Sequence, residues 1–375
     1  MTQLNPADES FLARLAADLP DTVLSEAEPR YLSEPRGLYH GQAGALARPR
    51  NTEEVATLVR HAAAARVPVV PYGGGTGLVG GQVAWDGPAP LVISLERMTA
   101  TRGLDPLAGT LTVEAGAILA DVQTAAEDAG KLFPLSLASE GSARIGGLLS
   151  TNAGGVNVLR YGNARDLVLG VEAVLPTGTV LHGLKGLRKD NLGYDLRHLL
   201  IGAEGTLGII TAACLRLVPR PADQATALMV VDNPAEALRL LDMARDLVGD
   251  GLSAFELIAR AGLEFLEEVG PEIRQPFAKK PGWMCLIDLG LPKGQNAGDA
   301  LMTLFEAALE AGLVQDGLIS QSEAQRQDFW TIRESIPEAN KRIGAISSHD
   351  ISVPIGAIPA FLDEAPRRIA HLGPV

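Results

Sequence analysis

The sequence is poor in cysteine and in aromatic residues. Cys214 and Cys285 are its two cysteines among 375 residues, both lie in apolar runs, and aromatic residues make up 4%. Two isolated cysteines exclude a disulfide framework of the kind that holds small secreted domains together. We therefore expect buried structural thiols and a reducing, cytoplasmic location.

Positive charge is also scarce, and long apolar runs are missing. The chain has 32 Lys and Arg against 45 Asp and Glu, a net charge of −13. This balance argues against a nucleic-acid surface or an anionic membrane surface. The most apolar long window, 199–218, contains Glu204, Arg216 and three glycines, so no transmembrane helix is expected there. The first twenty residues have no basic segment followed by an apolar core, so we expect no signal peptide.

Glycine, in contrast, is concentrated in one stretch around which the other elements are arranged. Residues 67–81 read VPVVPYGGGTGLVGG, an apolar β-branched run followed by six glycines within nine residues. The run predicts a buried strand that ends at Tyr72. A turn needs fewer glycines, whereas several convergent backbone N–H groups form a concave site for phosphate. We predict that residues 73–81 are a pyrophosphate-binding loop.

A dinucleotide-binding Rossmann fold is the main alternative for this stretch. Gly75, Gly77 and Gly80 match G-x-G-x-x-G, and Glu96 lies after a second strand. That motif needs a helix to begin within the glycines, but residues 78–90 contain three glycines and two prolines. The missing helix disfavours the Rossmann fold and a nicotinamide-dependent enzyme. A purely structural glycine loop remains the second alternative.

The first half of the chain is predicted to alternate strands and helices. A helix at 5–19, capped by Asn5, precedes a loop-rich leader at 20–44. A strand at 45–48, a helix at 52–66 with its cap around Thr52, and the strand at 67–72 form a β-α-β unit. Further strands are predicted at 91–95, 109–115, 167–176, 179–183 and 209–218, with a helix at 119–129.

Two more glycine-rich stretches follow the first. Residues 132–162 form the longest irregular stretch and are dominated by Gly, Ser, Thr and Asn, and residues 202–208 interrupt an apolar run. A long loop inside a compact domain is usually functional, and small polar residues suit contact with a large flat polar ligand. The alternative for residues 145–155 is a helix N-terminus followed by a turn.

Pro219 and Pro221 mark a boundary, after which the pattern changes. Two β-α-β-like units predict a ferredoxin-like sheet with helices on one face. The predicted strands are 227–231, 254–258, 284–289 and 351–353, and the predicted helices are 234–247, 296–312, 321–343 with an interruption near Pro337, and 357–371.

The three glycine-rich stretches together resemble the flavoprotein fold of the vanillyl-alcohol oxidase type. They are PYGGGTG at 71–77, IGG and STNAGG within 145–155, and EGTLGIIT at 204–211. Within that fold the chain is most similar to the FAD-linked D-2-hydroxyacid dehydrogenases, which include D-2-hydroxyglutarate dehydrogenase, D-lactate dehydrogenase and the FAD subunit of glycolate oxidase. The resemblance extends through residues 188–195, 329–334 and 349–354.

The resemblance implies an α+β fold in three parts. They are an N-terminal helix and leader at 1–44, a PCMH-type FAD-binding domain of two α/β subdomains at 45–219, and a partial ferredoxin-like cap at 220–375. FAD is expected to be non-covalent, because covalent members attach it through a histidine near the first glycine loop and none lies between His61 and His182. The residues implied to bind FAD are Pro71, Gly73, Gly74, Gly75, Thr76, Gly77, Gly80, Gly81, Ser136, Gly141, Ile145, Gly146, Ser150, Asn152, Gly154, Gly155, Tyr161, Gly162, Glu204, Gly208 and Ile209.

The implied reaction is oxidation of a D-2-hydroxy acid of the 2-hydroxyglutarate, lactate or glycolate type to the 2-oxo acid, with hydride transfer to flavin N5. Arg333, one helix turn from Trp330, matches the arginine that pairs with the substrate carboxylate. Its alternative is a surface ion pair with Glu334 or Glu338. His349 is a second catalytic candidate, whose alternative is a packed loop residue. The implied partners are the small hydroxy acid and an electron acceptor (a quinone, a cytochrome or an electron-transfer flavoprotein). A homodimer and peripheral association with the inner membrane face are further expectations, and no nucleic acid is expected.

The sequence departs from the family pattern in two respects. Ser348 stands where hydroxyglutarate-type members have a lysine, and Pro337 replaces a polar residue, so a dicarboxylate substrate is not assumed. The family's G-H-x-G-D-G-N-L-H motif and E-H-G segment, which supply the base and the ligands of a divalent metal, expected to be zinc, follow the region where this sequence stops. The six histidines present show no ligand spacing. We therefore expect an incomplete substrate site, and the alternative is a catalytically incomplete flavin-binding subunit or fragment that needs a partner.

Overall fold

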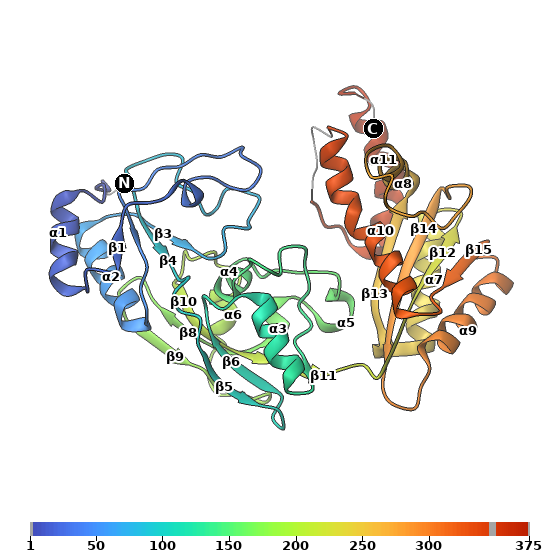
Figure 1. Ribbon diagram of the computed structural model, residues 1–375, viewed down its shortest axis with the longest axis horizontal. Coiled ribbons are helices and arrows are strands. Elements are labelled where there is room, and N and C mark those ends of the chain that lie inside the picture. The colour runs from blue at the N-terminus through green and yellow to red at the C-terminus, as the bar shows by residue number, and fades with distance from the viewer. Residues whose placement is uncertain (1–2, 345–349, 374–375) are drawn as a thin grey trace. The chain divides into compact units, whose positions relative to one another are not determined.

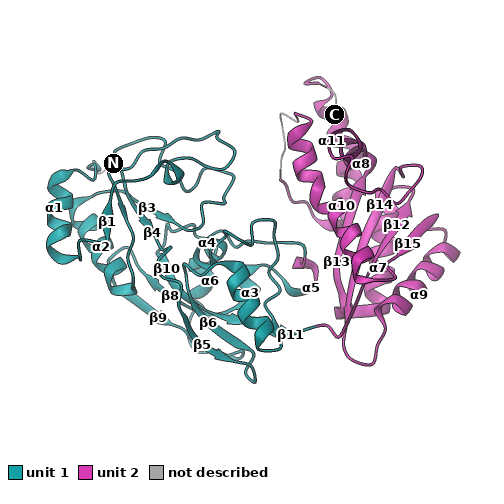
Figure 2. Ribbon diagram, in the orientation of Figure 1, with its two compact units in different colours: residues 1–156, 161–220 teal, residues 157–160, 221–375 magenta. Residues whose placement is uncertain are grey.

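The computed structural model describes residues 3–344 and 350–373. The chain folds into two compact units, which Figure 2 distinguishes by colour. Unit 1 comprises residues 1–156 and 161–220, and unit 2 comprises residues 157–160 and 221–375. Each unit has its own sheets and its own hydrophobic core.

The first sheet of unit 1 carries the predicted β-α-β unit. Its strands lie in the order β1 (Leu24–Ser25), β2 (Ala45–Ala47), β4 (Leu91–Ser94), β3 (Val69–Tyr72), and β4 pairs in parallel with both β2 and β3 (Figure 1). The connection from β2 to β3 is helix α2 (Thr52–Ala65), whose apolar face enters the core together with helix α1 (Glu9–Asp18). The helix predicted at 52–66 from apolar residues at helical spacing is therefore confirmed as an amphipathic helix.

The predicted cap of α1 was wrong, and the cap of α2 lies one residue before the predicted capping region, which forms the first turn of that helix. Asp8, not Asn5, caps α1 by accepting the N–H of Phe11, and Asn51, not Thr52, caps α2 by accepting the N–H of Glu54. Both caps have extended backbone, which a cap residue needs so that its side-chain oxygen reaches an unpaired N–H of the first turn.

The second sheet of unit 1 is antiparallel. Its order is β5 (Thr101–Asp105), β6 (Thr110–Glu114), β10 (Ile209–Arg216), β8 (Val168–Val174), β9 (Val180–Gly183). Helices α3 (Leu119–Asp128) and α4 (Ile145–Ser150) contribute their buried side chains to the core of this sheet. The sequence analysis did not predict β5. It gave a helix at the position of α4 only as the alternative to a ligand-binding loop. Short elements complete the unit: β7 (Lys131–Leu132) paired with β11 (Val218–Pro219), and α6 (Arg197–Leu200).

A buried carboxylate joins α2 to the second sheet. Glu172 on β8 is 8% exposed and accepts hydrogen bonds from the hydroxyls of Thr52 at 2.6 Å and Thr211 at 2.9 Å. The guanidinium of Arg102 donates a third at 3.0 Å. Burial alone would raise the pKa of Glu172, but these three donors outweigh it and hold the pKa below its ordinary value.

This carboxylate gives the fold a defined acid sensitivity. A group with a lower pKa in the folded chain stabilises the fold above its unfolded pKa, and that contribution is lost as the pH falls through the folded pKa. We expect the free energy of unfolding to decline below pH 4.5, the ordinary glutamate value, more steeply in the wild type than in Glu172→Gln. Urea titrations from about pH 7 to pH 3 measure this, with exposed Glu53→Gln as the matched control. Parallel pH profiles for wild type and Glu172→Gln would contradict the assignment.

Unit 2 contains a four-stranded antiparallel sheet. Its order is β13 (Leu252–Ala259), β14 (Trp283–Leu291), β12 (Asp223–Val231), β15 (Asp316–Ile319). With α7 (Pro234–Val248) after β12 and α9 (Ala297–Glu310) after β14, the connections follow the β-α-β-β-α-β order of a ferredoxin-like fold. Helix α8 (Arg260–Val269) is an addition between β13 and β14. Residues 157–160, which include most of the short helix α5 (Val158–Tyr161), also belong to this unit. Arg160 donates there to the hydroxyl of Ser253 and the carbonyl of Gly290.

Helices cover both faces of this sheet, not one as predicted. Alternate residues of β12 and β14, such as Met229 and Ile287, form the core with α7 and α9. The intervening residues, such as Thr226 and Asp288, face helix α10 (Glu323–Arg342). Leu228 and Leu286 on that second face are also fully buried, so it too requires a covering element.

Two further expectations for unit 2 were wrong. Helix α10 continues through Pro337 without interruption, and residues 351–353 form no strand. The final helix, α11 (Ile358–Ile369), agrees with the prediction.

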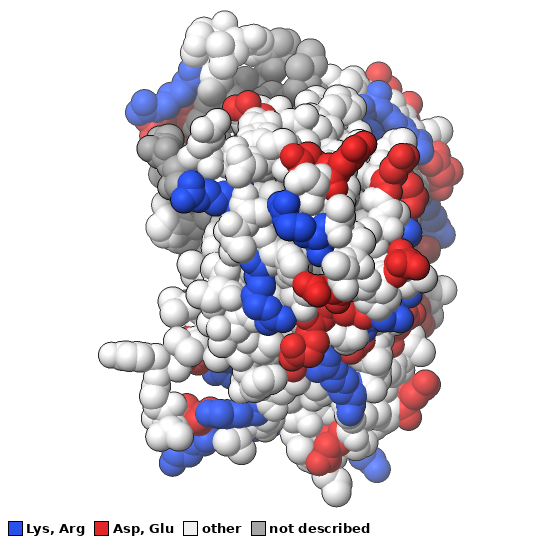
Figure 3. All heavy atoms as spheres, turned by 90° about the vertical axis from the view of Figure 1, so that its left-hand side faces the viewer, with Lys and Arg blue, Asp and Glu red and all other residues white. Residues whose placement is uncertain are grey.

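None of the helices in residues 3–344 and 350–373 has the length and apolar character needed to span a bilayer. Figure 3 shows acidic and basic side chains interspersed over the face that it draws, so no field of one sign extends across its described part.

Candidate functional site

A cleft in unit 1 brings the three glycine-rich stretches together. Its walls come from residues 71–77 at the end of β3 and in the loop that follows it, from residues between 143 and 151 before and within α4 and at its end, and from Glu204, Gly205, Ile209 and Ile210 before and at the start of β10. The backbone N–H of Glu204, which has a positive φ of 50°, donates to the carbonyl of Ser150 at 2.9 Å and so joins the third stretch to the second.

The first two stretches approach each other so closely that side chains are excluded between them. A Cβ on Gly73 would lie 3.1 Å from the Cα of Gly147, and one on Gly74 would lie 2.3 Å from the carbonyl oxygen of Ser142. A Cβ on Gly146 would lie 2.8 Å from the Cβ of Ala115. Bare backbone therefore forms much of the wall, which suits a ligand recognised by main-chain groups.

About half of the predicted FAD-binding residues line this cleft. They are Pro71, Gly73, Gly74, Gly75, Thr76, Gly77, Gly81, Gly146, Ser150, Glu204 and Ile209. The others lie outside its lining: Gly80, Ser136, Gly141, Ile145, Asn152, Gly154, Gly155, Tyr161, Gly162 and Gly208.

Several of the residues outside the lining have other roles in the structure. Ile145 is 1% exposed and packs into the core, and the side chain of Asn152 accepts the N–H of Arg165. Gly208 lines a neighbouring apolar pocket with Val59 and Ala62.

The polar side chains of the cleft that the sequence analysis missed include Gln82 and Arg144. Gln82 donates from Nε2 to the carbonyl of Gly77 at 2.7 Å and thereby holds the glycine loop. Arg144 donates to the carbonyls of Gly116 and, at 3.5 Å, Glu96. Their places in the sequence could have revealed them, because each is adjacent to a predicted FAD-binding stretch. Gln82 directly follows the first group of glycines, and Arg144 directly precedes Ile145.

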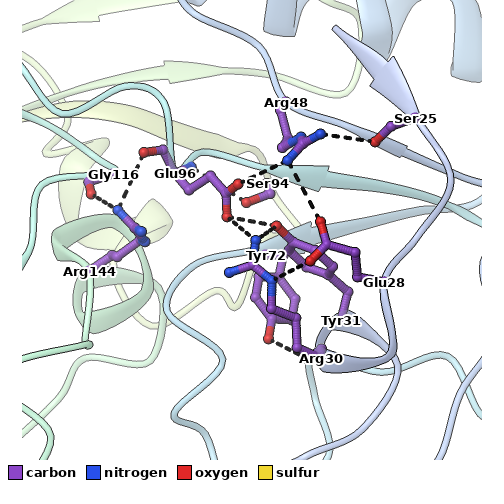
Figure 4. Close-up of polar contacts among 10 residues, drawn as sticks. All are labelled: Ser25, Glu28, Arg30, Tyr31, Arg48, Tyr72, Ser94, Glu96, Gly116 and Arg144. Atoms are coloured by element: carbon purple, nitrogen blue, oxygen red, sulfur yellow. Dashed lines mark hydrogen bonds and ion pairs between the residues drawn. The ribbon is translucent and has the colours of Figure 1, made fainter. Parts of the chain in front are cut away.

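A cluster of five residues, the leader cluster, supports the base of the glycine loop (Figure 4). It consists of Arg30, Tyr31, Arg48, Tyr72 and Glu96. The Tyr31 hydroxyl donates to Glu96 at 2.7 Å, and the guanidinium groups of Arg30 and Arg48 approach the same carboxylate at 3.5 and 3.7 Å. Burial, with the hydrogen bond to Glu96, raises the pKa of Tyr31 to about 12.

Tyr72, the last residue of β3, ties this cluster to the loop. Its hydroxyl donates to the carbonyl of Arg30 at 2.9 Å, and its ring meets that of Tyr31 edge-on with centroids 4.9 Å apart. Glu96, which the Rossmann alternative would place on a ribose, here accepts the Tyr31 hydroxyl instead. The leader therefore fixes the strand from which the glycine loop emerges.

We expect Tyr31→Phe to lower the free energy of unfolding by about 1–3 kcal/mol, because it leaves a mostly buried carboxylate without its hydroxyl donor. Urea denaturation followed by circular dichroism measures the change. Tyr194→Phe is the matched control, since the Tyr194 side chain is 94% exposed. Equal stability of Tyr31→Phe and wild type would show that the leader cluster contributes nothing to the fold.

The second candidate site lies in unit 2 and centres on Arg333. Its Nε donates to Glu256 Oε2 at 2.8 Å, and its side chain is 32% exposed. The ion pair is therefore with Glu256, not with Glu334 or Glu338. Among the residues that the structure describes, no hydrogen bond to either Nη atom of Arg333 is found. His349 lies outside the described residues.

No metal site accompanies Arg333 in the described part of the chain. Residues 3–344 and 350–373 contain no group of three or more His, Cys, Asp or Glu side chains placed to hold a metal ion. Cys214 and Cys285 are both free and buried, and burial raises the pKa of Cys285 to about 12. The divalent metal remains an implication of the sequence resemblance alone.

Two family models match the chain. Residues 43–183 match the FAD binding domain, and residues 220–373 match the C-terminal domain of FAD linked oxidases. The alkyldihydroxyacetonephosphate synthase structure in a triclinic crystal has a TM-score of 0.75 at 18% identity, covering 100% of this chain and 78% of its own. Chitooligosaccharide oxidase has a TM-score of 0.61 at 16% identity, covering 83% of this chain and 60% of its own. These likenesses establish the PCMH-type fold.

Curated relatives share more of the sequence. D-2-hydroxyglutarate dehydrogenase of Xanthomonas citri pv. viticola is 41% identical over 321 residues, which are 85% of this chain and 66% of the relative. The mitochondrial D-2-hydroxyglutarate dehydrogenase of Arabidopsis thaliana is 36% identical over 338 residues, which are 90% of this chain and 60% of the relative. The chain thus spans 60–66% of the length of these relatives.

Proposed function

The chain belongs to the flavoproteins that join an FAD binding domain to the C-terminal domain of FAD linked oxidases, and from this premise we propose that it oxidises a D-2-hydroxy acid to the 2-oxo acid. The observation that carries the proposal is the convergence of the three glycine-rich stretches on one cleft. The names of the curated relatives, D-2-hydroxyglutarate dehydrogenases, support the substrate class.

The residues of the cleft fit a large cofactor with a pyrophosphate. The main chain of Gly73–Gly77 would hold the phosphates, because added side chains at Gly73 and Gly74 would meet backbone atoms and, within the described part of the chain, these five residues donate no backbone hydrogen bond to another main-chain group. The hydroxyls of Thr76 and Ser150 add further polar contacts. With no histidine among the lining residues, FAD would be held non-covalently. When bound, FAD would supply the hydride acceptor for the C2 hydrogen of the substrate.

Arg333 would bind the substrate carboxylate. A planar guanidinium offers two parallel N–H donors to a carboxylate, which orients the substrate as well as attracting it. The hydroxyl proton must pass to a base, for which His349 is a candidate within this chain. Ser348 and Pro337 leave the choice among 2-hydroxyglutarate, lactate and glycolate open to experiment.

The proposal assigns a part to each region of the chain. Residues 1–44 would form the leader, residues 45–219 the FAD-binding domain, and residues 220–375 the substrate cap. The electron acceptor proposed for the reaction is a quinone, a cytochrome or an electron-transfer flavoprotein. The two buried free cysteines support a reducing compartment such as the cytoplasm.

The alternative is a flavin-binding subunit or fragment that needs a partner to complete its substrate site. This alternative is kept because the chain spans 60% of the length of the Arabidopsis thaliana relative. Both forms of the proposal require FAD in the cleft. They differ in whether the isolated chain catalyses oxidation of the hydroxy acid.

Anaerobic reduction of the FAD-loaded protein tests the proposal. D-2-hydroxyglutarate, D-lactate and glycolate are added separately, with the L-enantiomers of the first two as controls, and the flavin band near 450 nm is followed. Bleaching by one D-acid and not by its L-form is the expected result. Bleaching only after a cell extract is added would favour the partner-dependent alternative. A flavin that no hydroxy acid reduces, with or without extract, would overturn the proposed reaction.

A further inference from the structure

Two carboxylates project from one face of the unit 2 sheet. Asp288 on β14 lies opposite Ala254 on β13, and Glu256 is two residues further along β13. Since side chains alternate between faces along a strand, Glu256 and Asp288 share a face. Thr226 on β12 lies opposite Asp288 on its other side and belongs to the same face. This is the face that α10 covers.

Helix α10 turns one of its own faces toward these carboxylates. Arg326, Trp330 and Arg333 are spaced by four and three residues, so they lie along a single helix face. Asp288 is 4% exposed, and its Oδ1 accepts from Thr226 at 2.5 Å, Trp330 Nε1 at 3.1 Å and Arg326 Nη1 at 3.2 Å. A buried acceptor shared by two residues of α10 fixes both the rotation and the axial position of the helix.

With α10 fixed in this way, Arg333 comes to lie beside Glu256. The Nε–Oε2 distance is 2.8 Å, and the two side chains are 32% and 26% exposed. This contact uses the Nε side of the guanidinium. Its terminal edge, Nη1 with Nη2, has no hydrogen-bond partner among the described residues and is the edge that a carboxylate binds end-on.

We propose that Glu256 is a positioning residue that holds the guanidinium of Arg333 by its Nε, so that the terminal Nη edge takes one carboxylate of a 2-hydroxy acid or 2-oxo acid. This rests on the proposed function, in which Arg333 binds the substrate. The role requires a hydrogen-bond acceptor at position 256. It does not require the charge, because a neighbouring carboxylate would by itself repel an anionic substrate.

The role predicts different results for two substitutions of one residue. Glu256→Gln keeps an amide oxygen that can accept from Nε, whereas Glu256→Ala removes the acceptor and frees the arginine side chain to leave its orientation. We expect Glu256→Ala to weaken binding of a 2-oxo acid by about tenfold and Glu256→Gln to stay within about threefold of the wild type. Recovery by glutamine separates positioning by a hydrogen bond from a simple charge effect.

The test measures the dissociation constants of pyruvate and 2-oxoglutarate by calorimetry on the full FAD-loaded chain. Glu264→Ala, an exposed glutamate of the same unit, is the matched control, and thermal unfolding shows that each variant is folded. Arg333→Ala serves as the reference for loss of the binding group. The expected order of affinity is wild type, Glu264→Ala and Glu256→Gln together, then Glu256→Ala, then Arg333→Ala.

Several outcomes would overturn the inference, and they are distinguishable from failure of the proposed function. If Arg333→Ala loses binding while Glu256→Ala binds normally, Glu256 has no positioning role. Arg333 then keeps its proposed role in binding the substrate. If Glu256→Gln is as weak as Glu256→Ala, the charge matters and the positioning role is wrong. If wild type binds neither acid, or Arg333→Ala binds as well as wild type, the proposed role of Arg333 fails and this inference fails with it.

Discussion

Gly74→Ala is expected to abolish FAD binding. The added Cβ would lie 2.3 Å from the carbonyl oxygen of Ser142 and 3.1 Å from the Cα of Ala143. Both obstacles are backbone atoms, so no side-chain rotation can relieve the clash. The glycine loop and the segment that precedes α4 would have to separate, and those are two walls of the cleft.

The loss of affinity should be large because the ligand depends on both walls at once. We expect at least a 100-fold increase in the FAD dissociation constant, about 2.7 kcal/mol, because main-chain donors must be in place before they can bind phosphate. Titration of the flavin-free protein with FAD, followed by flavin fluorescence, measures it. Thermal unfolding without FAD separates a damaged cleft from an unfolded chain.

Gly103→Ala is the matched control for this substitution. It makes the same chemical change on β5 in the same unit, and its Cβ would meet nothing within 4 Å. Its FAD affinity should equal that of the wild type. If Gly74→Ala also bound FAD normally, the glycine loop would not be the binding element, and the purely structural interpretation of its glycines would stand.

Arg333→Lys is expected to raise KM for the D-2-hydroxy acid by about 100-fold. Lysine keeps the positive charge but loses the planar pair of donors, so the expected cost of about 2–3 kcal/mol is that of losing two-point contact with the carboxylate. The flavin spectrum and FAD affinity should not change, since the cofactor proposal places FAD in the cleft of unit 1. Steady-state kinetics with an artificial electron acceptor measures KM and kcat separately.

Arg342→Lys provides the control on the same helix. The Arg342 side chain is 51% exposed and pairs with Glu338 at 3.3 Å, an ordinary surface contact. Its replacement should leave KM unchanged. A normal KM in Arg333→Lys would remove Arg333 from the substrate site and leave its pair with Glu256 as a structural contact only.

Local sequence patterns predicted most of the regular elements, because those elements bury apolar residues that are close together in the sequence. Helix α2 follows from apolar residues at helical spacing, and strands β3 and β4 follow from short continuous apolar runs. Helix α4 was left as an alternative, because Gly146 and Gly147 are poor helix formers. It forms since its remaining apolar residues, such as Ile145 and Leu149, are buried in the core.

The pairs that organise the two candidate sites could not be predicted in the same way. Tyr31 and Glu96 are 65 residues apart, and Glu256 and Arg333 are 77 residues apart. Neither pair leaves a local pattern, because each depends on how separate elements pack. The glycine loop could be predicted because the residues that form it are nine consecutive positions of the sequence. The role of Arg333 in binding the substrate carboxylate was implied by the family resemblance.

The visible absorption spectrum of the purified full chain, before and after acid precipitation, tests the central claim that unit 1 binds FAD non-covalently. The expected result is a flavin band near 450 nm that moves entirely to the supernatant, where the released compound is FAD. A band that stays with the precipitate would mean covalent attachment. A folded protein that stays colourless after incubation with FAD would contradict the assignment of the cleft altogether.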